Sequence, residues 1–436
     1  MIDFLNVLSD QKDALKATDI GIFIARDAAR NLNLNSKLAQ IVIGVRRSGK
    51  STMCMKHLME SGVSFAYVNF DDERLNGMAA QDLNDMLATL YRIYGSFTHL
   101  FMDEVQNIEG WHLFVNRVLR QGVKVVLTGS NANLLSSELS THLTGRYNQV
   151  ELLPLSFAEL CTLRGVDRCS FSTKSMALRH RLLDEYIDHG GLPEIYTEDV
   201  TDSYLPSLMH AIVFKDVCVR YKVRYPSTLW QMANILLDNF CQELSLGKLA
   251  KQLNVSSVHT VKRYVEYLAE AYLVCLVPKF SFKSAARQTL GKVYAIDPAF
   301  VTMRGQTIVR RQEGWMIENI VYLELRRRYH LATQSIYYLK QPDFEVDFVV
   351  CEGGHVVKLV QVTYKWTAPS AKQYNREVGG LVKGSKFTSC KALILVVGEG
   401  AHAKIEKDGL SIDVLPASSF LSMEQVSIST ESSSER

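Results

Sequence analysis

Hydrophobic residues in the first 155 positions form short continuous runs separated by segments of helical spacing. Four of these runs have the length of buried strands, at residues 38–45, 63–70, 99–103 and 123–131. Met53, Met55, Leu58 and Met59 recur at helical spacing between the first two runs. Because strands and helices alternate, the pattern predicts an α/β fold with a parallel sheet that carries helices on both faces.

The pattern changes after residue 155, and each change predicts another domain beyond the sheet domain of residues 1–155. Residues 156–225 have helical spacing and little strand character, which indicates a helical lid. In residues 226–310 two helices joined by a turn precede two strand-like pieces, which is typical of a winged helix. Residues 311–416 begin with a helix and continue with strands. Residues 417–436 are rich in Ser and Glu, lack an apolar period and are predicted to be disordered.

The composition is that of an ordinary globular protein. The chain has 436 residues, of which 47% are hydrophobic and 22% are charged, and its net charge of +3 gives no overall signature of nucleic-acid binding. No apolar stretch approaches the ~20 residues of a membrane-spanning helix. The N-terminus lacks the order of a signal peptide, and the cysteines have no paired spacing. These observations predict a cytoplasmic protein without a membrane partner.

The segment that joins the first strand to the first helix has the spacing G-x-x-x-x-G-K-[ST], which is the phosphate-binding loop of nucleoside triphosphatases. Its residues are Gly44, Val45, Arg46, Arg47, Ser48, Gly49, Lys50, Ser51 and Thr52. The glycines allow backbone angles that wrap N–H groups around a triphosphate, and the N-terminus of the following helix attracts anions. Lys50 is predicted to reach the β- and γ-phosphates, and Ser51 to place its hydroxyl on Mg²⁺.

A later apolar run ends in the pair Asp103-Glu104, which is typical of the Walker B strand that accompanies such a loop. A buried parallel strand carries Asp103 to the edge of the sheet where the loop lies, so Asp103 is predicted to hold Mg²⁺. Glu104 is predicted to orient and polarise the attacking water. Phosphoryl transfer asks mainly for positioning and charge stabilisation, and these residues supply both.

Three further residues are candidates for catalysis. Ser130 and Asn131 end the strand at residues 123–131, where a polar side chain lies between the acid pair and the γ-phosphate. Arg146 stands in a turn before another strand, at residues 149–153. An arginine there could neutralise transition-state charge in its own subunit or in a neighbouring one, and a surface salt bridge is the alternative.

The second helix of the predicted winged helix carries His259, Lys262 and Arg263. These side chains are candidates for contact with the backbone of duplex DNA. Winged helices also serve in packing and in protein contacts. The sequence therefore leaves a DNA partner and a protein partner open for this element.

Residues of the C-terminal α/β domain follow the order of a restriction-endonuclease core, in which carboxylates hold Mg²⁺ and a lysine orients water. Asp347 lies at the position of the first strand carboxylate, and Glu318 on the preceding helix is an additional candidate ligand. Gln361 replaces the second carboxylate and Thr363 the lysine, while Lys365 lies on the same strand face two residues later. This degenerate site favours binding over cleavage, so nuclease activity is not expected.

These motifs together resemble the AAA-type P-loop ATPases of bacteria and archaea that carry a C-terminal endonuclease-like domain of unknown function. The matching segments span nearly the whole chain and include residues 44–52, 101–106, 127–130, 154–159, 190–194, 318–319 and 345–348. The resemblance implies binding and hydrolysis of ATP by an AAA-type core, a helical lid, a winged helix and an endonuclease-like end. The choice of ATP over GTP rests on this resemblance, and the chain has no guanine-reading N-K-x-D motif.

The leading hypothesis is a cytoplasmic Mg²⁺-dependent ATPase that couples nucleotide turnover to a conformational change, with duplex DNA as a candidate partner. Two alternatives fit the same residues. One is a nucleotide-gated signalling switch with a protein partner, and the other is an ATP-regulated DNA-processing nuclease. A trans-acting Arg146 would require a homo-oligomer, and the sequence leaves the oligomeric state open.

Overall fold

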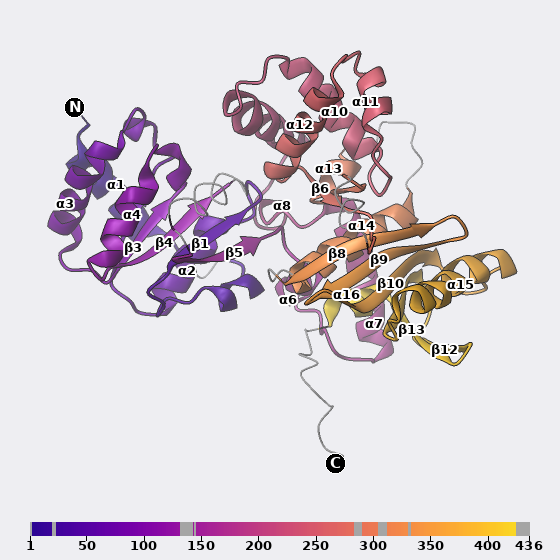
Figure 1. Cartoon of the computed structure of the whole chain (residues 1–436). Coiled ribbons are helices and arrows are strands. Elements are labelled where there is room, and N and C mark those ends of the chain that lie inside the picture. The colour runs from indigo at the N-terminus through magenta and orange to yellow at the C-terminus, as the bar shows by residue number, and fades with distance from the viewer. Residues whose placement is uncertain are drawn as a thin grey trace. The chain divides into compact units, whose positions relative to one another are not determined.

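The computed structural model describes residues 2–19, 23–130, 143, 145–282, 290–303, 312–329 and 333–423 (Figure 1). Its contacts divide the chain into two compact units. Unit 1 consists of residues 1–154, 192–226 and 263–273, and unit 2 consists of residues 155–191, 227–262 and 274–436. The segment predicted as a continuous lid, residues 156–225, is therefore divided between the two units. No helix in the described part of the chain is long and apolar enough to cross a membrane.

Unit 1 is built on a five-stranded parallel sheet with the strand order β2-β3-β4-β1-β5. The strands are β1 (Ala39–Gly44), β2 (Phe65–Asn69), β3 (His99–Asp103), β4 (Lys124–Gly129) and β5 (Tyr147–Leu152). Every residue of β1 and β3 is buried, as expected of parallel strands that are covered on both faces. The α/β fold with a parallel sheet that the sequence predicts is confirmed.

The crossover helices explain how both faces are covered. They are α2 (Lys50–Glu60) between β1 and β2, α3 (Leu83–Tyr94) between β2 and β3, and α4 (Trp111–Arg120) between β3 and β4. The first crossover runs across the sheet in the opposite direction to the other two, so right-handed connections place α2 on one face and α3 and α4 on the other. Figure 1 shows α2 and α4 on opposite sides of the sheet. Met53 and Leu58 of α2 pack with Val42 and Phe101 of the sheet in one hydrophobic cluster.

Segments from later in the chain complete unit 1. The remaining elements of its first segment are α1 (Phe4–Ala17), η2 (Asp27–Asn31), η3 (Glu73–Leu75), η4 (Ala80–Asp82) and η5 (Val105–Asn107). Residues 192–226 add α8 (Glu194–Thr197), α9 (Tyr204–His210) and the π-helix η7 (Ala211–Val219). Residues 263–273 include the second half of α12 (Val258–Glu270). Tyr272 donates a hydrogen bond of 2.9 Å to Glu151 of β5, and the ring of Tyr221 stacks on that of Tyr267, which joins these segments to each other and to the sheet.

Unit 2 contains a six-stranded mixed sheet with the order β12-β13-β11-β10-β9-β8. The strands are β8 (Gln334–Gln341), β9 (Phe344–Glu352), β10 (His355–Lys365), β11 (Leu393–Glu399), β12 (Ala403–Lys407) and β13 (Leu410–Pro416). The pairs β10–β11 and β11–β13 are parallel and the others antiparallel. Two helices frame the sheet, α14 (Glu313–Arg328) and α15 (Ala371–Thr388), and α15 buries Val378 and Leu381 against Val346 and Leu359.

The remaining elements of unit 2 include the helix pair and strands that predicted a winged helix. These are α10 (Pro226–Asp238), α11 (Leu246–Gln252), the first half of α12, and the antiparallel pair β6 (Val274–Val277) and β7 (Lys292–Ala295). The other helices are α6 (Phe157–Leu163), α7 (Thr173–His189) and α13 (Ala299–Thr302). The assignment of a winged helix and of an endonuclease-like domain stays a prediction.

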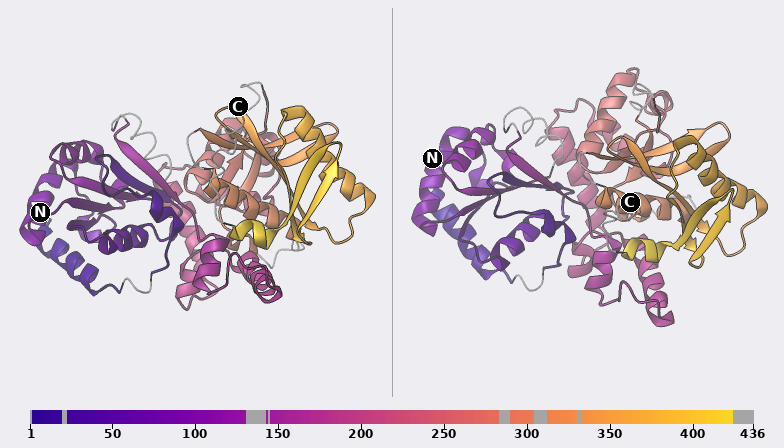
Figure 2. Two further views of the ribbon diagram at one scale, coloured as in Figure 1. Left: turned by 90° about the horizontal axis from the view of Figure 1, so that it is seen from below. Right: turned by 60° about the horizontal axis from the view of Figure 1, so that its bottom comes forward.

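The predicted start of a disordered tail at residue 417 is wrong. Ala417–Ser422 form helix α16, drawn in yellow in Figure 2 beside the C-terminal sheet. Ala417, Phe420 and Leu421 are buried, so three apolar residues at helical spacing suffice to dock a segment that is otherwise rich in serine. Residues 424–436 lie outside the described part of the chain.

Candidate functional site

The phosphate loop lies where β1 ends, at the carboxyl edge of the unit 1 sheet. Gly44 has a φ of +149°, and a Cβ atom there would lie 2.0 Å from the carbonyl oxygen of Leu152, so only glycine fits beside β5. Gly49 has a φ of +84° and immediately precedes α2. This left-handed conformation favours glycine. The loop therefore closes onto the N-terminus of α2, whose unpaired N–H groups favour anions.

Lys50 is buried at the first position of α2. Its Nζ donates hydrogen bonds to the carbonyl oxygens of Gly44 and Val45, at 3.2 and 2.9 Å. Burial lowers the pKa of Lys50, and the nearby carboxylates of Glu104 and Asp103 oppose this effect. Carbonyl oxygens carry only partial charge, so the ammonium group is incompletely neutralised and attracts an anion.

Asp103 ends β3 and is surrounded by hydroxyl groups. Ser51 Oγ donates to its Oδ1 at 2.7 Å, Thr128 Oγ1 donates to the same oxygen in a short contact, and Tyr67 Oη donates to Oδ2 at 3.4 Å. Burial raises the pKa of Asp103, although the hydrogen bonds from Thr128 and Ser51 partly oppose the rise. The hydroxyl of Ser51 and the carboxylate of Asp103 are the hard oxygen donors that Mg²⁺ prefers beside phosphates, so the residues present fit this metal.

Glu104 follows β3 with a left-handed backbone, at a φ of 53°. Its N–H donates to Thr128 Oγ1 at 3.0 Å, and its carboxylate accepts a short hydrogen bond from the amide of Gln106. The same amide lies 3.5 Å from Ser130 Oγ, so the structure brings the buried Ser130 beside the acid pair. Asn131, the other predicted candidate at this strand end, lies outside the described residues.

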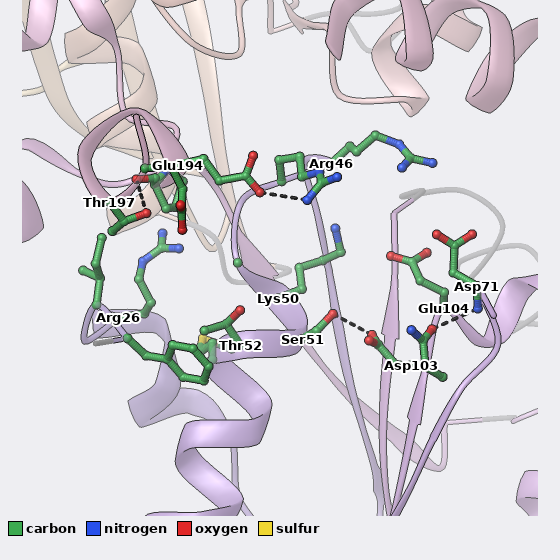
Figure 3. Close-up of a pocket in the computed structure, with 18 residues that line it drawn as sticks. Arg26, Arg46, Lys50, Ser51, Thr52, Asp71, Asp103, Glu104, Glu194 and Thr197 are labelled. Atoms are coloured by element: carbon green, nitrogen blue, oxygen red, sulfur yellow. Dashed lines mark hydrogen bonds and ion pairs between the residues drawn. The ribbon is translucent and has the colours of Figure 1, made fainter. Parts of the chain in front are cut away.

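Lys50, Ser51, Asp103 and Glu104 line a cavity of about 720 Å³, within the range of roughly 300–1,000 Å³ that is typical of small-molecule sites. Figure 3 shows the side chains of Lys50, Glu104 and Asp71 directed toward the same opening. Another wall comes from residues 193–198 and consists of Pro193, Glu194, Thr197 and Glu198. The buried hydroxyl of Ser48 in the phosphate loop has no hydrogen-bond partner among the residues that the structure describes.

Two arginines of the phosphate loop are paired with acids from residues 192–226. Arg46 donates from Nε and Nη2 to the two carboxylate oxygens of Asp216, at 2.8 and 2.9 Å. Arg47 donates from Nη1 to Glu194 at 2.9 Å. Neither acid was a sequence-predicted site residue, because both lie far from the loop along the chain and no spacing rule connects them to it.

Arg26 is another site residue that sequence reasoning missed. Its side chain is buried, donates from Nη1 to the carbonyl oxygen of Ser48 at 2.5 Å and donates from Nη2 to that of Leu153 at 2.6 Å. It therefore ties the phosphate loop to the chain just beyond β5. The sequence around Arg26 gives no signal of this role, because the two partners are backbone atoms.

Arg146 lies near the opposite edge of the same sheet. Its carbonyl oxygen accepts a hydrogen bond from the N–H of Ala39, and Ala39 pairs with Tyr147 in the parallel ladder of β1 and β5. The loop begins at Gly44, about 17 Å further along the strand. The backbone of Arg146 therefore lies remote from the loop of its own chain, because a parallel strand begins at the edge opposite to the loop. The catalytic role of Arg146, which the sequence left open between cis and trans, stays a prediction.

The candidate DNA-contacting residues are each exposed. His259, Lys262 and Arg263 are exposed on α12, whereas Val261 and Val265 of the same helix are buried. Arg263 donates a short hydrogen bond to Tyr267 Oη. The three residues are accessible to a partner, and contact with DNA stays a prediction.

The predicted endonuclease-like residues line a second cavity, of about 660 Å³, in unit 2. Gln361 Oε1 accepts from the N–H of Asp347 at 3.2 Å, and Asp347 Oδ2 accepts from the N–H of Val362 at 2.9 Å. Glu318 lies in the same cavity wall, and Lys365 lines the cavity as an exposed residue. The structure therefore brings Glu318, Asp347 and Gln361 together and leaves Lys365 open to solvent.

A buried lysine that the sequence analysis did not single out joins this cluster. Nζ of Lys292 on β7 lies 2.9 Å from Glu345, 3.3 Å from Glu318 and 3.7 Å from Asp347. Burial opposes the charge, but these carboxylates outweigh it and raise the pKa of Lys292. The ammonium group supplies positive charge between acids. In the described part of the chain, no group of three or more His, Cys, Asp or Glu side chains is arranged to hold a metal ion.

Comparison with known proteins gives two family matches and two close relatives. The profile described as "AAA domain" matches residues 36–161, and that described as "Domain of unknown function (DUF8612)" matches residues 180–306. An uncharacterized protein of Methanocaldococcus jannaschii is 30% identical over 427 residues, which cover 95% of this chain and 93% of that protein. An uncharacterized protein of Haemophilus influenzae is 29% identical over 343 residues, which cover 75% of this chain and 82% of that protein.

Matches to solved structures are more distant. A Walker-type ATPase of Pyrococcus abyssi is 14% identical with a TM-score of 0.44, and the match covers 64% of this chain and 95% of that one. AMPPCP-bound DnaA from Aquifex aeolicus is 13% identical with a TM-score of 0.30, and the match covers 58% of this chain and 91% of that one. Both family profiles end before residue 311, so they leave the predicted endonuclease-like domain untested.

Proposed function

Because this chain belongs to the family of the Methanocaldococcus jannaschii protein and carries an AAA-type P-loop ATPase domain, we propose that it binds ATP with Mg²⁺ and hydrolyses it. The observation that carries the proposal is the convergence of Lys50, Ser51, Asp103 and Glu104 on one cavity. They come from two elements far apart in the chain, the start of α2 and the end of β3. Their chemistry, one buried cation beside hydroxyl and carboxylate oxygens, suits a magnesium triphosphate.

Each group of residues in the cavity has its own role in the proposed hydrolysis. The N–H groups of the loop and of the start of α2 bind the phosphates, and Lys50 exchanges its carbonyl partners for β- and γ-phosphate oxygens. Ser51 and Asp103 hold Mg²⁺, which when bound neutralises the charge of the phosphates. Glu104 orients the attacking water and accepts its proton, while Gln106 and Thr128 fix the position of Glu104.

A conformational response to the nucleotide is the second part of the proposal. Glu194 and Asp216 hold the loop arginines in a cavity whose wall includes residues 193–198. A polyphosphate is attracted to the same cations, so its arrival changes the forces on residues 192–226. Such a response supports a nucleotide-gated switch as much as an ATPase that couples continuous turnover to movement. A protein partner that recognises the nucleotide-bound conformation remains part of the proposal.

DNA is the favoured partner to test first, because His259, Lys262 and Arg263 lie exposed on α12. Cleavage of DNA is not part of the proposal. The acids of unit 2 already face the ammonium group of Lys292, and Gln361 stands where a carboxylate would be needed. Unit 2 is therefore proposed to bind rather than to cut.

The test is ATP turnover by the full chain with Mg²⁺ or with a chelator, with and without duplex DNA, for the wild type and for Glu104→Gln. Glu109→Gln is the matched control, since Glu109 is an exposed acid in the turn that follows. We expect Glu104→Gln to lose turnover about 100-fold while still binding ATP, and Glu109→Gln to match the wild type. Equal turnover in both variants would contradict the role of Glu104.

The DNA arm of the same experiment separates the partners. Turnover that rises with DNA in the wild type and stays flat in Glu104→Gln supports coupling to nucleic acid. Turnover indifferent to DNA shifts the proposal to the protein-linked switch. Absence of both nucleotide binding and turnover in the wild type would overturn the proposed function.

A further inference from the structure

The pairing of Arg46 with Asp216 fixes the plane of a guanidinium group inside the nucleotide cavity. Two of the three nitrogens, Nε and Nη2, are engaged by the two oxygens of one carboxylate at 2.8 and 2.9 Å. Such a bidentate pair restricts rotation about the end of the side chain. The third nitrogen, Nη1, makes no hydrogen bond among the residues that the structure describes, and Arg46 lines the cavity.

Asp216 is itself held rigidly. Its side chain is 7% exposed, and it lies in the π-helix η7, where its neighbours Ile212, Val213 and Val217 are buried. π-Helical turns are rare and occur frequently at functional sites. The buried neighbours anchor the helical turn that carries Asp216. The position of the carboxylate is therefore set by this turn, and the carboxylate can fix the orientation of the Arg46 side chain in the phosphate loop.

Arg46 faces the acidic side of the cavity. The carboxylates of Glu104 and Asp71 lie close enough to add to the effect of Asp216 in raising the pKa of the Arg46 guanidinium. Arg47, by contrast, pairs with Glu194 and is 58% exposed. Figure 3 labels Glu104 and Asp71 on one side of Lys50 and Glu194 on the other. Glu104 is the residue proposed to direct water at the terminal phosphate, so Arg46 is placed toward that phosphate.

Arg46 lines the cavity, whereas the backbone of Arg146 lies near the remote edge of the sheet, so Arg46 is the arginine of this chain that is placed to assist Lys50 at the terminal phosphate. We propose that Arg46 contacts the terminal phosphate of the bound triphosphate through its free nitrogen, and that Asp216 is the positioning residue that orients it. The inference rests on the proposed function and deepens it, because it names a second group, beside Lys50, that contacts a phosphate present in a triphosphate and absent from a diphosphate.

The test compares the affinities of the full chain for Mg²⁺-ATP and Mg²⁺-ADP by titration calorimetry. Arg46→Met is expected to weaken ATP binding about 10- to 100-fold and ADP binding less than about twofold, since only ATP carries the phosphate in question. Asp216→Asn keeps the shape of the side chain and loses the ion pair. It is expected to weaken ATP binding about three- to tenfold, again with little effect on ADP.

Two further variants separate positioning from simple charge. Arg46→Lys retains the charge but lacks the planar fork that pairs with both oxygens of Asp216, so we expect it to restore less than half of the lost ATP preference. Arg47→Met removes the same charge from the adjacent position and is expected to weaken ATP and ADP binding by the same factor. The ratio of the two affinities is insensitive to partial loss of folded protein, because unfolding lowers both equally.

Several outcomes would overturn the inference. Equal losses of ATP and ADP affinity in Arg46→Met would show that Arg46 does not read the terminal phosphate. Tighter ATP binding by Asp216→Asn than by the wild type would show that Asp216 withholds Arg46 from the nucleotide. A wild type that binds neither nucleotide overturns the proposed function as well, whereas a wild type that binds both and an unchanged ratio in Arg46→Met overturn this inference alone.

Discussion

Two buried lysines, one in each unit, show how the partners of a charge decide its role. Lys50 and Lys292 each line a cavity, of about 720 and 660 Å³, and each lies near carboxylates. Lys50 donates to two backbone carbonyl oxygens, and its pKa is lowered. Lys292 lies between three carboxylates, and its pKa is raised. The first lysine is prepared for an anion, and the second is already neutralised.

The opposite pKa shifts of Lys50 and Lys292 follow from the charges of the groups around them. Removing an ammonium group from water costs free energy that carbonyl dipoles recover only in part, so an incoming phosphate gains by completing the interaction. Acids at 2.9 to 3.7 Å recover the cost of Lys292 within the folded chain, and a ligand gains little there. Identical Lys→Met substitutions should therefore have opposite consequences in the two units.

The largest effect is expected for Lys292→Met. Loss of the ammonium group leaves buried Glu318 and Asp347 without their cation, which should lower the free energy of unfolding of unit 2 by about 3–5 kcal/mol. Denaturant unfolding followed by circular dichroism measures this loss. Nucleotide affinity should stay within about twofold of the wild type, because Lys292 lies outside the nucleotide cavity. A Lys292→Met variant as stable as the wild type would contradict the stabilising role of Lys292.

Lys50→Met should impair ATP turnover and leave the stability of the protein nearly unchanged. Turnover of ATP is expected to fall about 100- to 1,000-fold, because a charged donor to the phosphates is lost. The stability of the ligand-free protein should change by less than about 1 kcal/mol, since the folded state already disfavours the buried ammonium. A steady-state assay of ATP hydrolysis measures the turnover. A thermal scan with and without Mg²⁺-ATP measures the stability, and ATP should raise the melting temperature of the wild type only. A large loss of stability without ligand would contradict this interpretation of Lys50.

The pH dependence of the Lys292→Met effect sharpens the contrast. Burial raises the pKa of both Asp347 and Glu318, so the folded protein takes up these protons at higher pH than the unfolded chain does. Stability from such groups is present below their unfolded pKa and is lost as the pH rises through the folded one. The stability gap between the variant and the wild type should narrow as the pH falls from about 8 to about 5. A constant gap would mean that Lys292 stabilises by packing alone.

The smallest effect is expected for Glu345→Gln. The side chain of Glu345 is 38% exposed, so water screens its ion pair with Lys292 even at 2.9 Å. The loss of stability should be about 1 kcal/mol or less, against the loss of about 3–5 kcal/mol expected for Lys292→Met. Paired denaturation curves of the two variants measure the ranking, and a reversed order would show that exposure does not govern this cluster.

The features that the sequence predicted well are local. The phosphate loop lies within nine consecutive residues, and the acid pair ends a single apolar run, so composition and spacing suffice to find both. The AAA-type domain and the parallel sheet are confirmed. The roles of Lys50, Ser51, Asp103 and Glu104 stay predictions until turnover is measured.

The features that the sequence missed depend on tertiary structure. Lys292 lies in a strand of otherwise apolar residues, and its partners belong to α14 and β9, so no spacing rule connects them. Asp216 and Glu194 reach the loop only because residues 192–226 belong to unit 1. The position of Arg146 could not be predicted for a related reason, since the direction of β5 decides at which edge of the sheet its preceding turn lies.

The interleaved order of the two units has a consequence for synthesis. The nucleotide cavity takes Pro193 and Glu194 from a segment that follows residues 155–191 of unit 2. A nascent chain that ends before residue 192 has the complete phosphate loop but lacks one wall of its cavity, and unit 1 is not complete before residue 273. No single cut between consecutive residues can separate the units. A gene for either unit alone would therefore have to join three separate segments of the coding sequence.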